Sequence, residues 1–461
     1  MITASTATAV KDDVAALPLA PKNPLPHRQQ VRALRAFHTG CEALRDAGGP
    51  VTRLILAPKW LMPPVVVVTS PQGAHDVLGR GGALVDRTRV HEEMRHLMGP
   101  NLFDLPHEPW LPRRRTLQPL FTKQHVREFG GDMAQAAEMV VGGWGDGAVV
   151  DLDTECRRLT LRALGRSVLG LNLDVHAESI AAPLRVALEF VADRGNAPVH
   201  APRWLPTPAR RRARGASATL RRLAEDILRS CRADPARNAP LVQSLIAATD
   251  PATGAALTDD EICDELVTFM LAGHDTTATT VTYAVWALGN NTALQDEVAA
   301  EVAEIGRREL TPDDVPRLPR TVQVLHEALR LCPPGAVTGR TAVQDIAVDG
   351  YRVEAGSIVI VGIYALHRDP ALWDRPLVFD PDRFSPDNSK ARDRWQYLPF
   401  GAGPRSCIGD HFAMLEATLA LATIVRGHEI HSLSDEFPMA VPFTTVADAP
   451  IYARVTERID A

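Results

Sequence analysis

The sequence predicts a mainly α-helical fold with a small β component. Apolar residues recur at helical spacing over most of the 461 residues, whereas valine-rich runs of strand length are few. Residues 258–290 form the longest periodic segment, and Thr258 and Glu261 have the form of a capping box at its start. Apolar side chains occupy most faces from Leu266 to Leu288. Such a helix is expected to run through the middle of a fold rather than over its surface.

The N-terminal part is predicted to supply much of the β component. Residues 28–48 have helical periodicity, and residues 51–57 and 64–70 flank a proline-containing turn as a small hairpin. Another short helix is expected over residues 73–78. Residues 86–106 lack clean periodicity, so we expect a long loop with short helical pieces, which is often functional in a compact domain.

Helical periodicity continues through the middle of the chain. The expected helices span residues 108–122, 124–143, 151–169, 177–194, 208–233, 239–249, 291–306 and 319–331. Short strands are expected at 344–353 and 357–361, before an irregular stretch over 366–400 that is rich in Pro, Asp, Arg and Phe. A last helix to about Val425 and a few strand-like pieces complete the chain.

The composition is that of a large globular protein, with 45% hydrophobic and 23% charged residues. No linker or low-complexity run marks a boundary, so we expect a single domain over residues 28–461 after a proline-rich extension at 1–27. The formal net charge of −6 suggests no nucleic-acid partner.

The six cysteines are widely spread and form no CxxC pair. This pattern favours free thiols in a reducing compartment over a disulfide framework. The N-terminus has no apolar stretch long enough for a signal peptide or a membrane span. We therefore expect a cytoplasmic protein without a membrane span.

A glycine-rich loop at residues 400–409 holds one cysteine. The helical run that follows places this cysteine before a helix N-terminus, where unpaired amides and the helix dipole favour a thiolate. Such a thiolate suits a metal with one protein ligand, and a buried structural cysteine is the alternative. The form FxxGxRxCxG, which resembles the haem-ligand loop of the cytochrome P450 family, is met by Phe400, Gly403, Arg405, Cys407 and Gly409.

The predicted central helix contains a polar interruption, Ala272-Gly273-His274-Asp275-Thr276-Thr277. A kinked helix whose polar residues satisfy one another is one explanation. Beside the Cys407 loop, the interruption resembles the oxygen-binding groove of the same family. The resemblance implies that Gly273 makes room over the iron, and that Asp275 and Thr276 pass protons to dioxygen. His274 is expected to face away from that pair and is assigned no role.

Glu327 and Arg330 lie three residues apart and so share one face of the helix predicted at 319–331. Such a pair is usually a surface ion pair of little energetic value. Here the pair resembles the family's ExxR helix, and Arg383 resembles the arginine of its PxRF partner. The resemblance implies a buried Glu-Arg-Arg cluster with a structural role in folding and haem retention.

Trp110 and Arg114 lie four residues apart on one face of a predicted helix. An indole N–H and a guanidinium are suitable donors to a carboxylate, and a basic helix start is the alternative. The pair is similar to the WxxxR pair that binds a haem propionate in the family. Arg340 and Arg405 also resemble propionate-binding positions, and the resemblance places Phe400 in the haem-binding loop.

Three residues near Trp110 and Arg114 also carry polar or charged side chains: His107, Arg113 and Arg115. Some bacterial members of the family use a histidine in this region, but the spacing favours Trp110, so a contribution of His107 stays open. Arg113 and Arg115 should point elsewhere. We expect them on the proximal surface, where an acidic electron donor could dock.

Together these motifs identify the chain as a member of the cytochrome P450 family, of the soluble bacterial type. The resemblance implies a triangular, mostly α domain with haem b between the central helix and the Cys407 loop. It implies a haem-thiolate monooxygenase that inserts one oxygen atom from O2 into a lipophilic small molecule by hydroxylation or epoxidation. Electrons would come from NAD(P)H through a separate reductase and a ferredoxin or flavodoxin.

Two other functions compete with this one: a haem-thiolate peroxygenase or isomerase that does not use O2, and a haem carrier or sensor. Such proteins have less need of an acid–alcohol pair, so Asp275 and Thr276 favour the monooxygenase. Its substrate contacts are expected from residues 86–106, 188–206, Phe269, Ala272, 336–337 and 443–444.

Overall fold

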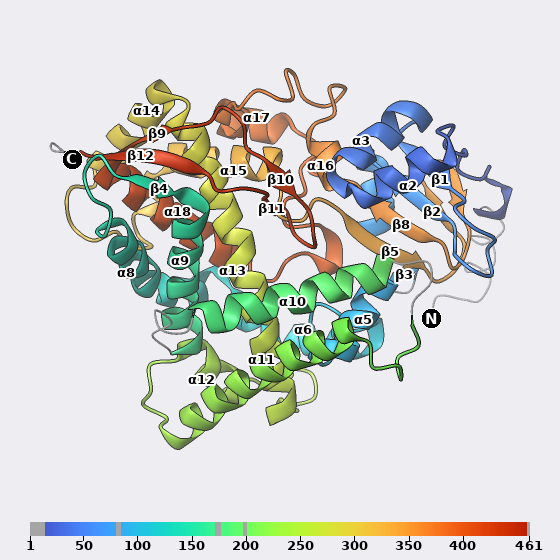
Figure 1. Cartoon of the computed structure of the whole chain (residues 1–461), viewed down its shortest axis with the longest axis horizontal. Helices are drawn as coiled ribbons and strands as arrows, with labels where there is room; N and C mark the ends of the chain where they lie inside the picture. The colour runs from blue at the N-terminus through green and yellow to red at the C-terminus, as the bar shows by residue number, and fades with distance from the viewer. Residues whose placement is uncertain (1–13, 80–83, 171–176, 197–200, 459–461) are drawn as a thin grey trace.

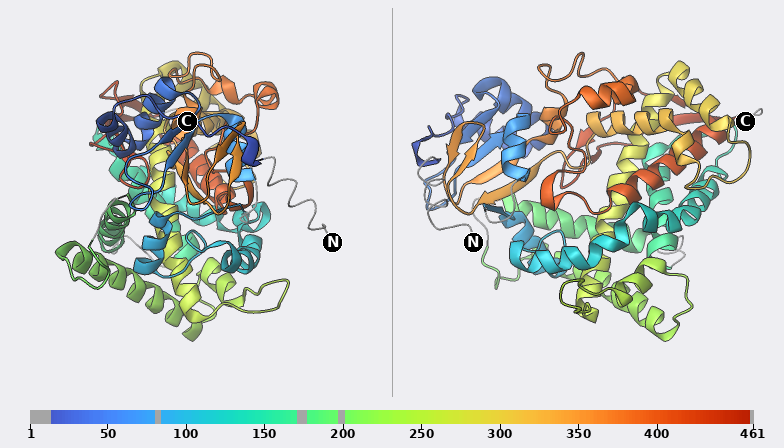
Figure 2. Two further views of the ribbon diagram at one scale, coloured as in Figure 1. Left: turned by 90° about the vertical axis from the view of Figure 1, so that its right-hand side faces the viewer. Right: turned by 180° about the vertical axis from the view of Figure 1, so that it is seen from behind.

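The computed structural model describes residues 14–79, 84–170, 177–196 and 201–458 (Figure 1). The described part is mainly helical with small sheets, as the sequence predicts. The largest sheet lies at one end of the molecule and the long helices fill the other, which the two further views in Figure 2 also show. No helix within the described ranges has the length and apolar character needed to cross a membrane.

The first predicted helix is two helices, α2 (His27–Arg35) and α3 (Phe37–Gly48). Ala36 leaves the helical conformation between them, with φ −110° and ψ 64°. The two helices approach closely at Gly40, where an added Cβ would lie 1.8 Å from the Ala33 carbonyl oxygen. Periodicity alone does not register this break, because both halves keep an apolar face.

The main sheet has the order β1-β2-β8-β5-β3. The predicted hairpin is present: β1 (Val51–Leu54) pairs antiparallel with β2 (Val65–Val68), and all four β2 residues are buried. The other strands are β8 (Ile358–Val361), parallel to β2, then β5 (Thr338–Ala342) and β3 (Val85–Asp86). The β5 strand was not predicted, because its sequence TGRTA has one apolar side chain.

The N-terminal segment joins this end of the molecule. Leu19 and Lys22 bridge to Arg352 and Arg53, and the Asn23 side chain donates to the Leu44 carbonyl at 2.8 Å. These contacts hold the segment against the sheet end from residue 19 onward.

The segment expected to be a long loop at 86–106 contains a regular helix, α5 (Arg89–Met98). Thr88 begins it with a capping box, in which the Thr88 backbone amide donates to His91 Nδ1 at 3.3 Å. This capping box stabilises the helix despite poor periodicity. Only residues 99–106 remain a loop, which is a correction to the prediction.

Most of the remaining helices lie close to their predicted positions, although those predicted at 108–122 and 124–143 are each broken into shorter pieces. No helix was predicted at Ile363–His367 or Pro386–Ala391, and the second of these lies in the stretch expected to be irregular. The helices are α4 (Pro71–Ala74), α6 (His107–Leu117), α7 (Lys123–Val126), α8 (Gly130–Val141), α9 (Leu152–Leu164), α10 (Ala177–Asn196), α11 (Pro208–Ala233), α12 (Pro240–Ala247), α14 (Thr292–Ala303), α15 (Pro319–Leu331), α16 (Ile363–His367), α17 (Pro386–Ala391) and α18 (Asp410–Gly427). Short 3-10 or π turns extend several of them, among them His75–Gly79, Gln118–Phe121, Gly165–Leu169, Pro381–Phe384 and Gly403–Arg405.

The central helix α13 (Asp259–Gly289) has 31 residues and begins with the predicted capping box of Thr258 and Glu261. Most of its side chains are buried, and it packs against α9, α11, α15 and α18. Figure 1 shows it in yellow, crossing the middle of the molecule. The prediction from its all-round apolar character is confirmed.

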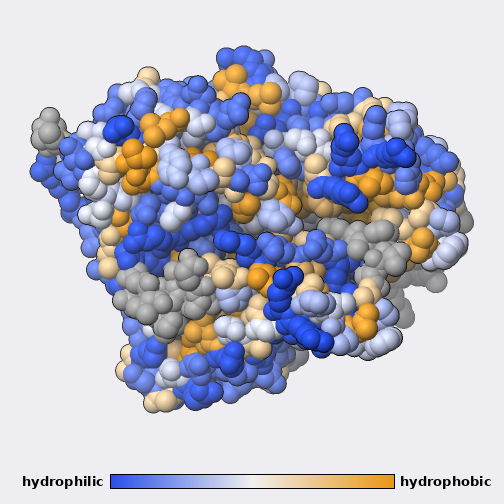
Figure 3. Space-filling model, in the orientation of Figure 1, coloured by the Kyte–Doolittle hydropathy of each residue, from blue (hydrophilic) through white to orange (hydrophobic). Residues whose placement is uncertain are grey.

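Smaller sheets complete the fold. They are β4 (Val149–Asp151), β12 (Tyr452–Glu457) and β9 (His428–Ser432) in one sheet, the pair β6 (Ile346–Val348) and β7 (Tyr351–Val353), and the pair β10 (Met439–Ala440) and β11 (Val446–Ala447). The face in Figure 3 is hydrophilic over most of its area, with scattered apolar patches.

Candidate functional site

The Cys407 loop is closed by its own backbone. The Cys407 amide donates to the Phe400 carbonyl at 2.9 Å, which joins the two ends of the glycine-rich stretch. Gly401 and Gly403 have φ of 67° and 72°, which side chains rarely adopt. A Cβ at Gly403 would lie 1.9 Å from the Leu78 carbonyl oxygen. The glycines therefore let this loop fold tightly against the turn at His75–Gly79.

Cys407 differs from the other five cysteines of the chain. All six are free and described, and Cys407 alone is exposed. Protein atoms still surround the sulfur broadly, and this burial raises the pKa of the thiol to about 11, although the Gly409 amide and Arg114 act to lower it. The predicted preference for a thiolate is thus outweighed in the chain alone. A metal that binds here must displace the proton.

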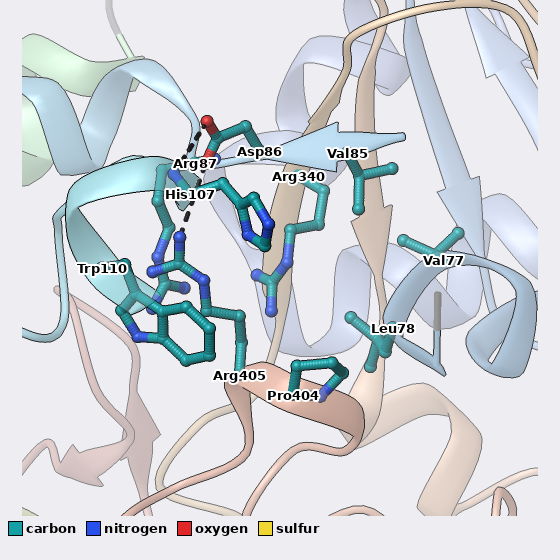
Figure 4. Close-up of a pocket in the computed structure, with 10 residues that line it drawn as sticks. All are labelled: Val77, Leu78, Val85, Asp86, Arg87, His107, Trp110, Arg340, Pro404 and Arg405. Atoms are coloured by element: carbon teal, nitrogen blue, oxygen red, sulfur yellow. Dashed lines mark hydrogen bonds and ion pairs between the residues drawn. The ribbon is translucent and has the colours of Figure 1, made fainter. Parts of the chain in front are cut away.

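A pocket close to this loop collects side chains from five separate parts of the fold (Figure 4). Three guanidinium groups point toward one another in it, with a histidine and a tryptophan beside them. The lining residues are Val77, Leu78, Val85, Asp86, Arg87, His107, Trp110, Arg340, Pro404 and Arg405. The lining residues run from Val77 to Arg405 in the sequence, and the β3–β5 pairing brings Asp86 beside Thr341.

The pocket has more positive than negative charge. Burial lowers the pKa of Arg340 and of Arg405 to about 10, and for Arg405 the neighbouring Arg340 adds to the effect. Burial, Arg340 and Arg405 together hold the pKa of Arg87 well below its usual range. Asp86 is the nearest counter-charge, and its Oδ1 is 3.7 Å from Arg405 Nη2. Such a cluster favours an anionic ligand.

Several donors in this pocket lack a partner within the described part of the chain. Arg87 Nε, Arg405 Nη2 and His107 Nδ1 are buried and make no hydrogen bond. Buried polar atoms normally find a partner, so these atoms indicate a ligand with acceptor oxygens. Two carboxylates of a haem fit this donor set, and the exposed sulfur of Cys407 fits its iron.

The predicted anchors divide into two groups. Trp110, Arg340 and Arg405 come together in the pocket, and the Arg405 guanidinium stacks 4.1 Å from the centre of the Trp110 ring. Arg114 does not line the pocket, because its Nη1 donates to the Ser406 carbonyl at 3.1 Å. This places Arg114 beside Cys407, where its charge acts to lower the pKa of the thiol and so favours the thiolate.

Sequence reasoning missed Asp86 and Arg87 and left His107 open. The structure brings all three to the pocket, where His107 lies against Trp110 with ring centroids 6.2 Å apart. Asp86 and Arg87 belong to no motif, and only the pairing of β3 with β5 places them there. The unused donor on His107 is the signal that marks it, and it exists only in three dimensions.

The expectation that Arg113 faces an electron donor is wrong, whereas for Arg115, which is exposed, it stays a prediction. Arg113 is buried, and its two terminal nitrogens donate to Glu265 at 2.7 Å and Glu261 at 2.6 Å on α13. Arg115 forms a two-bond fork with Asp250, at 3.0 and 2.8 Å. Both side chains hold α6 in place, because acids from other segments neutralise them.

The polar interruption of α13 has partners on α9. Asp275 Oδ1 is hydrogen-bonded to Arg157, and His274 Nε2 lies 3.7 Å from the same oxygen. The prediction that His274 faces away from this pair is therefore wrong. Thr276 Oγ1 donates to the Ala272 carbonyl at 2.7 Å. Asp275 and Thr276 thus make separate contacts in this structure.

The two small residues of the interruption face different surroundings. Ala272 is exposed although its neighbours Met270 and Leu271 are buried. The continuous helix α13 is therefore not covered by other side chains at this point, and we call this place the opening at Ala272. A Cβ at Gly273 would lie 3.1 Å from Leu164 Cδ1. The missing side chain of Gly273 therefore gives room to α9, and its predicted role over the iron stays a prediction.

The Glu-Arg-Arg cluster is present and buried. Arg330 and Glu327 have no exposed side-chain area, and they form two hydrogen bonds of 2.7 Å. Arg383 Nε is 3.4 Å from Glu327 Oε1, and the Asp380 amide donates to the same oxygen at 2.8 Å. Arg330 also donates to the carbonyls of residues 367, 376 and 378. The cluster fastens the irregular stretch that leads into the Cys407 loop.

The expected substrate contacts are partly brought together. The Phe103 and Phe443 rings lie 6.3 Å apart, which joins the loop at 99–106 to the turn near 443. Phe269 packs against Phe121 at 5.3 Å within the core, so its ring is turned toward the turn Gln118–Phe121. The part of the expected contacts at 197–200 lies outside the described residues.

Comparisons with known proteins agree with this geometry. Residues 21–447 match the family model described as Cytochrome P450. The chain is 35% identical to cyclooctatin synthase of Streptomyces melanosporofaciens, over 82% of each chain. It is 33% identical to cyclooctat-9-en-7-ol 5-monooxygenase of the same organism, over 74% of each chain.

A third relative is pentalenene oxygenase of Streptomyces avermitilis, which is 30% identical over 80% of this chain and 81% of its own. The fold is similar to the crystal structure of the cytochrome P450DA heme domain, with a TM-score of 0.83. That comparison covers 96% of this chain and 98% of the heme domain, at 26% identity.

Proposed function

Because this chain belongs to the cytochrome P450 family and is a monooxygenase, we propose that Cys407 ligates its haem iron and that its substrate is a lipophilic terpenoid. The observation that carries the ligand assignment is the loop itself. It holds the one exposed cysteine next to a pocket of arginines with unused donors. An iron-bound sulfur and two bound carboxylates account for both features at once.

The proposal gives each anchor a task toward haem b. Arg340, Arg405 and Trp110 bind the propionates, and Arg87 and His107 supply further donors from the same pocket. When bound through a thiolate, haem supplies the activation of dioxygen that side chains alone lack.

The side chains around the sulfur complete the haem site. Arg114 and the Gly409 amide stabilise negative charge on Cys407, and Phe400 closes the loop around it. Arg330 and Glu327 hold the segment before the loop and take no part in chemistry.

The proposed protonation pathway uses α13. The Asp275 carboxylate takes a proton from the solvent side, and the Thr276 hydroxyl passes it toward the opening at Ala272. An acid and an alcohol suit this task, because the acid exchanges protons with water and the alcohol both donates and accepts. To do this, Thr276 must exchange its bond to the Ala272 carbonyl for one toward the opening.

The substrate class rests on relatives and on the apolar side chains of the expected substrate contacts. Two relatives are named for cyclooctat-9-en-7-ol and pentalenene, and these names fit terpenoid substrates. In this chain Ala272 is small and exposed, and the rings of Phe103 and Phe443, which lie 6.3 Å apart, offer apolar surface in the segments expected to contact substrate. A bulky hydrocarbon skeleton with few polar groups fits such surfaces.

We further propose that electrons come from NAD(P)H through a separate reductase and a ferredoxin or flavodoxin. The six free cysteines suit the reducing cytoplasm, where such carriers operate.

The first experiment tests the ligand and the substrate. Reduced holoprotein with carbon monoxide should give a red-shifted Soret band, and Cys407→Ala should abolish it. Spin-state titrations with cyclic terpenes and terpene alcohols should give saturable shifts, whereas fatty acids should not. An unchanged band in Cys407→Ala would refute the ligand assignment, and shifts with fatty acids alone would refute the substrate class.

The second experiment separates the monooxygenase mechanism from a peroxygenase. Product should form with NAD(P)H and redox partners, and Thr276→Ala should divert electrons to hydrogen peroxide. Product that forms with added peroxide alone, together with unchanged coupling in Thr276→Ala, would favour a peroxygenase.

A further inference from the structure

The polar interruption of α13 is held from one side by a single helix. α9 packs along α13, and its residues Arg157 and Thr160 both reach the interruption. Arg157 binds Asp275 Oδ1 on one side and Asp153 Oδ2 on the other, the latter at 2.7 Å. The guanidinium is thus fixed between two carboxylates and cannot rotate without breaking one of these ion pairs.

His274 supports the same carboxylate from within α13. Its side chain is 3% exposed, and burial lowers its pKa, so the imidazole is neutral at pH 7. The Nε2 atom lies 3.7 Å from Asp275 Oδ1, and the Nδ1 atom lies 3.3 Å from Thr160 Oγ1. A carboxylate near Nε2 favours the tautomer with a proton on Nε2. Nδ1 is then an acceptor, and it shares the single Thr160 hydroxyl proton with the carbonyls of Arg157 and His274.

Both contacts use the same oxygen of Asp275. Within the described part of the chain, Arg157 and His274 approach Oδ1, and neither bonds to Oδ2. The side chain is one-quarter exposed, so Oδ2 is open to proton exchange with water. The carboxylate is therefore held by one oxygen and reactive at the other.

We propose that Arg157, His274 and Thr160 form a clamp that positions Asp275 for proton delivery, with Oδ1 as the anchored oxygen and Oδ2 as the proton carrier. The three are positioning residues, because they act through Asp275. The clamp rests on the proposed function, in which Asp275 and Thr276 deliver protons. It assigns a role to α9, which contributes no residue to the predicted motifs.

The clamp explains why the carboxylate and the hydroxyl are separate in this structure. A fixed Oδ1 keeps Asp275 at a set distance from Thr276, so water can bridge Oδ2 to the hydroxyl. Without the clamp, the carboxylate can turn into bulk water or bind Thr276 directly. Either change lengthens or blocks the proton pathway, and misplacement by about 1 Å can slow such a step by about a hundredfold.

The test compares variants of the clamp with a matched control in the holoenzyme, supplied with redox partners and a substrate that gives a spin shift. The variants are Arg157→Gln, Arg157→Lys, His274→Leu and Thr160→Val. The control is Arg158→Gln, since Arg158 lies next to Arg157 on α9 but pairs with Glu155 at the surface. Asp275→Asn and Thr276→Ala are measured in parallel.

Product per NAD(P)H should fall about tenfold in Arg157→Gln, with hydrogen peroxide rising to match and the solvent isotope effect on product formation increasing. Arg157→Lys should recover part of the loss, because it keeps the charge but not the two-sided fork. In His274→Leu the product per NAD(P)H should fall a few-fold, and in Thr160→Val it should fall less. The substrate spin shift and the control should stay unchanged.

Two readouts do not depend on turnover. Thermal unfolding of the single and double variants at Arg157 and Asp275 should be non-additive, because the two side chains touch. In ¹⁵N-histidine spectra of the reduced, carbon monoxide-bound protein, the resonance that His274→Leu removes should show a neutral ring protonated on Nε2, and Thr160→Val should shift it.

The outcomes separate the clamp from the proposed function. If Arg157→Gln and His274→Leu keep wild-type coupling while Asp275→Asn uncouples, the clamp is wrong and the relay stands. If Asp275→Asn and Thr276→Ala also keep wild-type coupling, the relay is wrong, and with it the role of the clamp. Additive unfolding of Arg157 and Asp275 variants would overturn the contact itself.

Discussion

Two clusters of largely buried arginines differ in how their charges are balanced. In the cluster of Glu327, Arg330 and Arg383, the guanidinium of Arg330 makes bonds to a carboxylate and to three carbonyls. In the pocket cluster of Arg87, Arg340 and Arg405, one aspartate faces three guanidinium groups, and buried donors stay unused. We call these the paired cluster and the unpaired cluster.

The difference separates structure from binding. The paired cluster gains little from a ligand, because Glu327 neutralises Arg330 and lies 3.4 Å from Arg383 Nε, although that nitrogen makes no hydrogen bond. An unpaired cluster carries repulsion that an anion relieves, so ligand binding stabilises it. Burial of arginine alone therefore does not mark a binding site; the presence or absence of partners does.

The largest effect is expected in the paired cluster. Arg330→Ala leaves the Glu327 carboxylate buried without its main partner, which should destabilise the fold by about 3–5 kcal/mol. Soluble yield, helical circular dichroism and haem content should fall together. Arg229→Ala, which removes an exposed arginine paired with Asp226, should change none of them. Normal haem content in Arg330→Ala would remove the structural role of this cluster.

In the unpaired cluster, a substitution should change haem retention without changing helical content. Arg405→Met removes a donor to the ligand and also removes repulsion from Arg340. Haem loss to an acceptor protein should speed up about 10–100-fold, since a hydrogen bond to a charged group contributes about 1.5–3 kcal/mol. The helical signal of the same sample should persist. Simultaneous loss of helix and haem would mean that Arg405 belongs with the structural arginines.

A smaller effect concerns Asp104, which is buried near the unpaired cluster and accepts from the Asn101 amide at 3.1 Å. Burial raises the pKa of Asp104 to about 7, although Asn101, Arg95 and Arg87 act to lower it. The folded chain therefore holds this proton more tightly than the unfolded chain, whose aspartates have a pKa near 4.

The higher pKa of Asp104 in the folded chain determines the direction in which stability changes with pH. The contribution of Asp104 to stability is full below about pH 4 and is lost as the pH rises to about 7. Asp104→Asn has no proton to lose, so it should remove about 1–2 kcal/mol of this decline. Denaturant midpoints at pH 5 and pH 8 measure it. An equal decline in both proteins would contradict the assignment.

The smallest effect is expected for Trp110→Phe. Phenylalanine keeps an aromatic face under the Arg405 guanidinium but loses the indole N–H. The cation–π contact of about 1 kcal/mol is largely kept, and the indole N–H is one of several donors in the pocket, so haem loss should speed up by only about two- to fivefold. Trp60→Phe, at an exposed position, is the matched control. A change as large as that of Arg405→Met would show that the indole N–H is a main propionate donor.

Prediction from sequence worked where one segment carries the whole feature. Each of three features is made by residues only a few positions apart: the Cys407 loop, the capping box at Thr258 and the Glu327–Arg330 pair. Spacing within one segment is enough to predict each of them. The long apolar helix was also predictable, because its pattern extends over 31 residues. In each case local geometry determines which side chains meet.

Prediction failed where side chains from distant segments meet. In the sequence, Arg113 is part of a basic helix start, yet in the structure it is buried and donates to two acids of α13. His274 was expected to face away from Asp275, yet its ring lies near that carboxylate from the preceding position of the helix. No pattern within α13 reveals that α9 supplies Arg157.

By itself, the sequence determined the helical class, the central helix and the loop around Cys407, because backbone propensity and short spacings specify them. Only the tertiary structure decided which arginines are paired, since a charge is neutralised by whatever side chain packs against it, however far away in the chain. The same packing placed Arg87 and His107 in the pocket and Arg157 on Asp275.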